Sequence, residues 1–205
     1  MPLDDVPVDF DPGLLIPADA DELIRDAEDR IERFIIASRQ SAPLPAFVAS
    51  DFRMVYRTLD RVLDRRLATG RGFCEWGCGF GVVAGLASRL GLEACGIEIE
   101  HDLVHHGQRL LEDHGLDVPI VQGSFVPPGG DELVDAVAQQ AWLKTGETPA
   151  YDELELEVDD FELIFAYPWP GEEELVDLLF ERFAAAGALL LTYHGMNEMR
   201  LQRKA

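Results

Sequence analysis

Cysteine is scarce in this 205-residue chain, which contains only Cys74, Cys78 and Cys95. An odd number of cysteines without close pairing does not make the disulfide framework that small secreted domains use. Cys74 and Cys78 are four positions apart, and no second Cys/His pair has the spacing of zinc ligands. We therefore expect three small packing residues in a reducing compartment, and no metal site.

Long apolar runs are also missing, and so is a basic leader. The chain begins Met-Pro-Leu-Asp-Asp, which is acidic and has neither the charged nor the apolar region of a signal peptide. No stretch approaches the roughly 20 apolar residues that cross a bilayer as a helix. The sequence thus predicts a cytoplasmic location and no membrane partner.

Positive charge is the third scarcity. Lys and Arg together number 17 against 39 Asp and Glu, so the formal net charge is -22 at pH 7. Such a surface repels phosphate, which argues against binding along a nucleic-acid backbone. A basic protein or a small molecule fits this field better as a substrate, although the charge could serve solubility alone.

Apolar residues are plentiful, at 47% of the chain, which is enough for one domain with a sizeable core. Residues 1–18 contain four prolines and show no period, so we expect an irregular arm there. Apolar residues then recur at helical spacing over 19–39 and 50–67. Residues 1–69 are therefore expected to form an arm and two helices packing on a main domain at 70–205.

Strand and helix patterns alternate along this main domain. The fourth strand pattern, at 161–167, is apolar almost throughout, as in a strand buried on both faces. The alternation with short links predicts an α/β fold, with a doubly wound, mostly parallel, Rossmann-like sheet covered by helices on both faces. Strands are expected at 72–75, 93–99, 118–122, 161–167 and 188–193, with helices at 82–90, 102–114 and 172–186.

Two stretches depart from the alternation. Residues 126–160 are too long for a plain crossover and contain a helix expected over 131–143, so they predict an insertion at the rim of the site. Residues 195–205 are too short for a closing pair of strands, although 198–203 could add one. The sheet edge at this shortened end could stay open, or be covered by the N-terminal arm or by the second subunit of a homodimer.

The strongest functional signal is the glycine turn, residues 75–81, with the sequence Glu-Trp-Gly-Cys-Gly-Phe-Gly. Glycines allow a tight turn and a close ligand, and the helix that follows presents free N–H groups. A dinucleotide fingerprint, Gly-x-Gly-x-x-Ala, fits residues 79–84 but leaves Gly77 inside the preceding strand. The register that starts at Glu75 accounts for the acid and all three glycines.

A partner acid follows at the end of the second strand. Glu98 stands seventeen residues beyond the last glycine, where a carboxylate can accept hydrogen bonds from both ribose hydroxyls. Glu100, two residues on and on the same strand face, is the second candidate. The structural alternative is that Glu98 only caps the next helix.

Residues 70–194 resemble class I, seven-strand S-adenosylmethionine-dependent methyltransferases. The resemblance rests on the glycine turn, on Gly-Ile-Glu-Ile at 96–99, on Gln-Gly-Ser-Phe at 122–125 and on the fourth-strand segment 160–170. Upstream, Phe-Val-Ala-Ser-Asp-Phe at 47–52 looks like the segment that leads into a helix in small protein-lysine methyltransferases of this class. Ala49 stands where those proteins often have proline.

The resemblance implies S-adenosylmethionine as the cofactor. It implies that the glycine turn cradles the methionine and ribose parts, that Glu98 holds the ribose, and that Ile99 and Phe125 lie against the adenine. Ser124 stands where the family commonly has an Asp that bonds the adenine amino group. The implied cofactor-binding residues are Glu75, Trp76, Gly77, Gly79, Gly81, Glu98, Ile99, Ser124 and Phe125.

The acceptor side is implied by Tyr-Pro-Trp-Pro at 167–170. Base and amide-nitrogen methylases carry Asn or Asp where Tyr167 stands, so this position argues against a nucleic-acid base as the acceptor. The Tyr167 hydroxyl and the face of Trp169 could instead line a pocket for an amine. A rigid turn is the structural alternative, and His194 at the end of the fifth strand is a candidate base or a structural residue.

These patterns predict an S-adenosylmethionine-dependent methyltransferase whose acceptor is a protein amine or a small molecule. A non-catalytic S-adenosylmethionine-binding or partner-binding protein on the same fold is the alternative, suggested by the short C-terminal end and by the atypical fourth-strand segment. A nicotinamide-dependent oxidoreductase is disfavoured by the register of the glycines.

Overall fold

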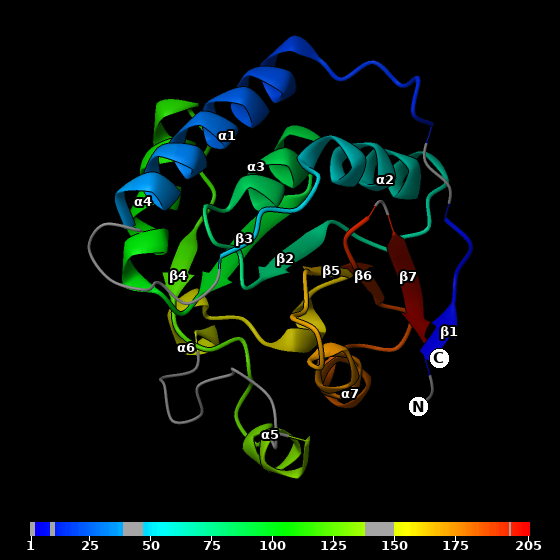
Figure 1. Cartoon of the computed structure of the whole chain (residues 1–205). Helices are drawn as coiled ribbons and strands as arrows, with labels where there is room; N and C mark the ends of the chain where they lie inside the picture. Colours follow the sequence, from blue (N-terminus) through cyan, green and yellow to red (C-terminus); the bar gives the residue numbers. More distant parts are fainter. Residues whose placement is uncertain (1–2, 9–10, 39–46, 138–149, 197) are drawn as a thin grey trace.

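The protein is built on one seven-stranded sheet (Figure 1). The computed structural model describes residues 3–8, 11–38, 47–137, 150–196 and 198–205. The strand order across the sheet is β1-β7-β6-β5-β2-β3-β4. In chain order the strands are β1 (Leu3–Asp5), β2 (Gly72–Trp76), β3 (Glu93–Glu98), β4 (Ile120–Gln122), β5 (Leu163–Ala166), β6 (Leu189–Tyr193) and β7 (Met199–Lys204).

Five of the strands, β2 to β6, run parallel, as the alternating pattern predicts. The chain moves outward from β2 through β3 to β4, then returns to the other side of β2 for β5 and β6. The carboxyl ends of β2 and β5 therefore flank the point where strand order reverses, which is where ligands bind in doubly wound sheets. All four residues of β5 are buried, in agreement with its apolar sequence.

Helices cover both faces of the sheet (Figure 1). The first face carries α1 (Ala18–Ser38), α2 (Phe52–Asp64), α3 (Val82–Arg89) and α4 (His101–Asp113), whose buried side chains share one apolar cluster with the sheet. A second cluster lies on the opposite face. That face carries α5 (Asp131–Val137), α6 (Tyr151–Leu154), the short 3-10 helix η1 (Val158–Asp160) and α7 (Glu173–Phe183).

The two expected N-terminal helices are present and pack on the main domain. Leu23, Ile24 and Ala27 of α1 and Val55 and Leu59 of α2 are almost fully buried in the first cluster. Helix α2 begins where Asp51 caps it, because the Asp51 carboxylate accepts a hydrogen bond of 2.9 Å from the Met54 N–H. Residues 39–46, between the two helices, lie outside the described residues.

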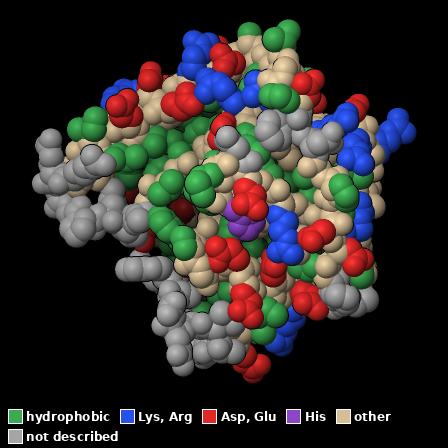
Figure 2. Space-filling model, turned by 45° about the vertical axis from the view of Figure 1, so that its right-hand side comes forward, with side chains coloured by type: hydrophobic (Ala, Val, Ile, Leu, Met, Phe, Trp, Pro, Cys, Tyr) green, Lys and Arg blue, Asp and Glu red, His purple; other side chains and the backbone are tan. Residues whose placement is uncertain are grey.

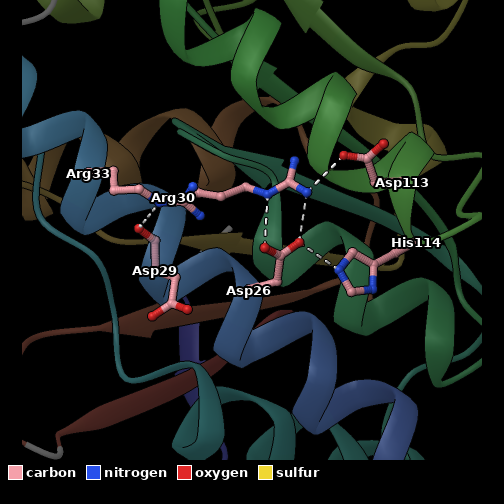
Figure 3. A network of polar contacts seen from close by, with 6 residues as sticks. All are labelled: Asp26, Asp29, Arg30, Arg33, Asp113 and His114. Atoms are coloured by element: carbon pink, nitrogen blue, oxygen red, sulfur yellow. Dashed lines mark hydrogen bonds and ion pairs between the residues drawn. The ribbon is translucent and has the colours of Figure 1, made fainter.

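A polar network fastens α1 to the end of α4 (Figure 3). Arg30 donates to Asp26 on its own helix at 3.0 Å and to Asp113 at 2.8 Å, and His114 Nε2 lies 3.0 Å from the Asp26 carboxylate. Burial raises the pKa of Asp26, but the hydrogen bonds and charges of Arg30 and His114 outweigh it and bring the pKa below its usual value. The N-terminal helix is thus tied to the helix that follows β3.

The N-terminal arm differs from the irregular segment that its prolines suggest. Leu3–Asp5 pairs antiparallel with β7, which itself pairs antiparallel with β6. Among the described residues, β7 is the one strand after β6, as expected for a shortened C-terminal end, and β1 supplies the seventh strand. Of the three possibilities that the sequence leaves open for this edge, the structure contains the one in which the arm covers it.

The segment at 126–160 is helical at both ends. Of the helix expected over 131–143, the structure describes α5 (Asp131–Val137), and residues 138–143 lie outside the described residues. Tyr151 on α6 is buried, and its hydroxyl donates to the Phe125 carbonyl at 2.8 Å. The end of this segment is therefore fixed to the loop that follows β4.

Candidate functional site

Three glycines with left-handed backbone shape the turn after β2. Gly77, Gly79 and Gly81 have φ values of 65°, 54° and 63°, a region that residues with a Cβ rarely adopt. The turn is closed by hydrogen bonds from Cys78 N to the Ile97 carbonyl at 2.9 Å and from Gly81 N to the Cys78 carbonyl at 2.7 Å. The spacing of the glycines in the sequence is therefore a requirement of the backbone.

Glu75 lies beneath this turn and is 5% exposed. Its carboxylate accepts a hydrogen bond of 2.7 Å from the N–H of Ala84, in the first turn of α3. The N-cap residue of α3 is Gly81, which has no side chain that could accept a hydrogen bond. Glu75, nine residues before Ala84 in the sequence, therefore accepts the hydrogen bond of this free N–H. Burial raises the pKa of Glu75 well above its usual value, the Ala84 hydrogen bond lowers it, and the charge of Glu98 raises it.

Glu98 reaches the same turn from the end of β3. One carboxylate oxygen accepts from Gly79 N at 2.8 Å and the other from Glu100 N at 2.9 Å. Burial raises the pKa of Glu98, and the hydrogen bonds from the backbone offset part of this increase. Glu100 itself begins α4 and makes no side-chain cap there. The structure thus places Glu98, the first of the two candidates, against the glycine turn.

The two buried acids have no cation beside them in the described part of the chain. Neither Glu75 nor Glu98 forms an ion pair with a described Lys, Arg or His. Buried carboxylates without a counter-charge are unfavourable in the ionised state. A ligand that brings positive charge to the turn would relieve this cost.

Two of the residues expected at the cofactor, Trp76 and Phe125, pack on the face of the sheet opposite Glu75. Phe125 is half-buried, and its ring stacks on Trp76 with centroids 5.2 Å apart and an angle of 10°. Trp76 is 2% exposed and packs in the cluster on the α7 face, opposite Glu75. Ile99 is half-buried, and the Ser124 hydroxyl accepts from Val126 N at 3.1 Å, within its own turn.

A small cavity of about 30 Å³ lies between the glycine turn and the segment that leads into α2. Seen from the side of Figure 2, charged side chains of both signs are interspersed, and hydrophobic side chains gather around a hollow in the surface. Residues 47–50 form one wall of the cavity. The sequence motifs did not assign these residues to the site. The cavity is lined by Phe47, Val48, Ala49, Ser50, Phe52, Glu75, Gly77, Cys78, Phe80, Val82, Phe165 and Tyr167.

On the acceptor side, the structure brings Tyr167 to this cavity. Its ring meets Tyr193 edge-on, with centroids 4.8 Å apart, and burial raises the pKa of its hydroxyl. Trp169 is not among the lining residues, and its backbone N–H donates to Glu172 at 3.3 Å in the turn before α7. His194 is not among them either; its Nε2 atom lies 2.8 Å from the Thr192 hydroxyl.

A larger open groove of about 640 Å³ runs along the end of α4 and the start of β4. It contains none of the predicted site residues. The described residues contain no group of three or more His, Cys, Asp or Glu that could hold a metal ion. Over the same residues, no helix is both long enough and apolar enough to cross a membrane.

Comparison with solved structures identifies the fold. A methyltransferase from Geobacter sulfurreducens is 18% identical, with 94% of each chain covered and a TM-score of 0.55. An RNA methyltransferase from Salinibacter ruber, solved with S-adenosyl-L-homocysteine, is 16% identical over 76% of this chain and 92% of that one, with a TM-score of 0.51. An O-methyltransferase from Bacillus cereus, also in complex with SAH, is 13% identical over 88% and 68%, with a TM-score of 0.51.

At these identities the likeness defines the fold: this chain has the Rossmann-like fold of class I S-adenosylmethionine-dependent methyltransferases. The expected fold class is confirmed. No family model matches the sequence, and no curated protein matches it significantly.

Proposed function

We propose that this protein is an S-adenosylmethionine-dependent methyltransferase. The observation that carries the proposal is the hydrogen bond that Glu98 accepts from the N–H of Gly79, at the point where the strand order of the sheet reverses. A carboxylate held there, beside backbone in the left-handed region that glycine favours, fits the cofactor site that the sequence predicts. The solved neighbours that contain S-adenosyl-L-homocysteine support the same cofactor.

The charges of the turn also suit this cofactor. S-adenosylmethionine would supply a methyl group on a positively charged sulfonium, next to a protonated amine. Glu75 and Glu98 are buried without a described cation, so a cationic ligand complements them. A dinucleotide would instead bring a negatively charged pyrophosphate towards two buried carboxylates.

The chain's own residues would align the reactants and exclude water. Methyl transfer is a direct displacement, and its rate depends mainly on orientation and on a dry site. The apolar side chains of Phe52, Phe80 and Phe165 wall the cavity, and Tyr167 would position the acceptor. A base is needed only if the acceptor arrives protonated.

For the acceptor we propose an amine, on a basic protein or on a small molecule, rather than nucleic acid. The net charge of -22 opposes a polyphosphate backbone and favours a basic partner. The Tyr167 ring at the cavity suits a cationic or amine group. An incubation with labelled S-adenosylmethionine, basic proteins and small amines would then show label on the amine.

Calorimetric titration tests the cofactor. We expect S-adenosylhomocysteine to bind and NAD to give no heat; the reverse result would contradict the proposal. Replacing Glu98 with Ala should weaken binding at least tenfold, about 1.4 kcal/mol, because the ribose hydroxyls lose their acceptor. The matched control is Glu100→Ala, which should leave binding within about threefold.

The non-catalytic alternative loses part of its support. It rested on closing strands that the C-terminal end seemed too short to provide, whereas β7 and β1 complete a seven-stranded sheet. Binding of the cofactor without transfer to any amine or basic protein would return the alternative to first place.

A further inference from the structure

The segment before α2 passes across the carboxyl end of β2 (Figure 1), and its first described residue, Phe47, covers the glycine turn. The Phe47 ring lies so close to Gly79 that a Cβ on Gly79 would collide with Cε2 and come within 3.2 Å of Cδ2 and Cζ. The same ring packs on Phe80 with centroids 5.7 Å apart. Phe47 therefore occupies the surface of Gly79 that faces the cavity.

The space left beside this ring is too small for an adenosyl ligand. The cavity measures about 30 Å³. Sites for small molecules enclose about 300–1,000 Å³. A cofactor can reach the backbone of Gly77 and Gly79 only if the Phe47 ring moves away.

Segment 47–50 is attached in a way that permits such a movement. No described residue forms a hydrogen bond with its backbone, and Val48 and Ala49 are exposed. The segment is anchored at its end, where Asp51 caps α2 and Phe52 is buried in the core. The chain can therefore pivot just before Asp51 without loss of the helix.

We propose that Phe47 is a gate over the cofactor site, closed on Gly79 in the free protein and displaced when the cofactor binds. This inference rests on the proposed function. The ring and the ligand compete for one surface, so opening of the gate limits the rate at which the cofactor associates. The aromatic side chain at this position then sets both the rate and the apparent affinity of binding.

The test is the association rate of S-adenosylhomocysteine with the immobilised full-length chain, measured by surface plasmon resonance. In Phe47→Ala the association rate constant should rise at least fivefold over the unaltered protein. Ile36→Ala, another large-to-small change at a half-exposed apolar residue outside the cavity, should stay within twofold. Phe47→Leu, which keeps apolar packing on Phe80, should lie between the two and replaces Phe47→Ala if that variant does not fold.

An association rate that is the same in the Phe47 variants and in the unaltered protein would overturn the gate while leaving the proposed function in place. Absence of binding by the unaltered protein and by every variant would overturn the proposed function, and the gate with it. A faster rate in Ile36→Ala equal to that of Phe47→Ala would also contradict a role specific to Phe47.

Discussion

At the scale of single residues, Glu75 combines a structural and a functional demand. Its carboxylate completes the first turn of α3 and lies in the wall of the cavity, while burial works against its charge. Glu98 adds a second buried acid beside it. Two buried carboxylates stabilise a bound cation but lower the stability of the free protein. Such a trade between function and stability is common.

This trade predicts opposite effects of Glu75→Gln on stability and binding. The folded-state pKa of Glu75 is raised, so the unaltered protein loses stability as pH rises above the unfolded value of about 4.5 towards the folded value. Gln keeps an oxygen for Ala84 N without the buried charge. Removing the buried charge should therefore raise the temperature of thermal unfolding at pH 7.5 by several degrees.

Binding should change in the other direction. Calorimetry should show weaker binding of S-adenosylmethionine to Glu75→Gln by about tenfold, because one carboxylate no longer faces the positive ligand. Glu132→Gln, at an exposed position on α5, is the control and should alter neither quantity. A variant of Glu75 that is less stable at pH 7.5 would contradict the assignment of a buried, unpaired charge.

The register of the glycine turn could be predicted because local backbone geometry alone demands it. The face of the sheet towards which Trp76 points could also be predicted. Neighbouring residues in a strand face opposite sides of the sheet, and Glu75 faces the cofactor side. The position of Phe47 could not, because its contact with Gly79 joins segments more than thirty residues apart and has no local signature. The assignment of Trp76, Ile99, Ser124 and Phe125 to the cofactor stays a prediction.

At the scale of elements, the helices were predictable from their apolar period, but their mutual contacts were not. The His106 ring on α4 stacks on Phe80 with centroids 5.3 Å apart, and His114 at the end of α4 pairs with Asp26. Both contacts bind α4 to residues distant in sequence. Spacing along one helix identifies its buried face but not the polar partner that another helix brings.

The α1–α4 network predicts a pH-dependent effect of Asp26→Asn. The folded-state pKa of Asp26 is lowered, so its contribution is present above the unfolded value of about 3.8 and is lost as pH falls through the folded value. The carboxylate is partly exposed, so we expect a loss of about 1 kcal/mol or less at pH 7. Urea unfolding should show this difference at pH 7 and a smaller one near pH 2.5; an equal difference at both values would contradict the ionic role.

At the scale of the whole molecule, the two ends of the chain complete the sheet together. β1 pairs with β7 in the register Leu3 with Lys204 and Asp5 with Gln202, and Val6 N donates to the Leu201 carbonyl at 2.8 Å. Arg200 on β7 adds ion pairs of 3.0 Å with Asp5 and with Asp177 of α7. The parallel core could be predicted from the alternation of strand and helix patterns. The pairing of β1 with β7 joins residues from nearly opposite ends of the chain, so the sequence could offer it only as one of several possibilities.

Removal of residues 1–5 should therefore leave the edge of β7 unpaired. The loss of a few backbone hydrogen bonds corresponds to about 1–3 kcal/mol, so thermal unfolding should occur several degrees lower. An open edge also promotes pairing between chains, and sedimentation velocity should show concentration-dependent association. A shortened chain with the same stability and the same sedimentation as the full chain would contradict the role assigned to β1.

The most direct measurement for the central claim is a crystal structure of the full chain with S-adenosylhomocysteine. The ligand should lie over Gly77 and Gly79 at the carboxyl end of β2, with its ribose hydroxyls on the Glu98 carboxylate. The Phe47 ring should have left Gly79. A ligand bound elsewhere, or one bound at the turn without contact to Glu98, would contradict the account.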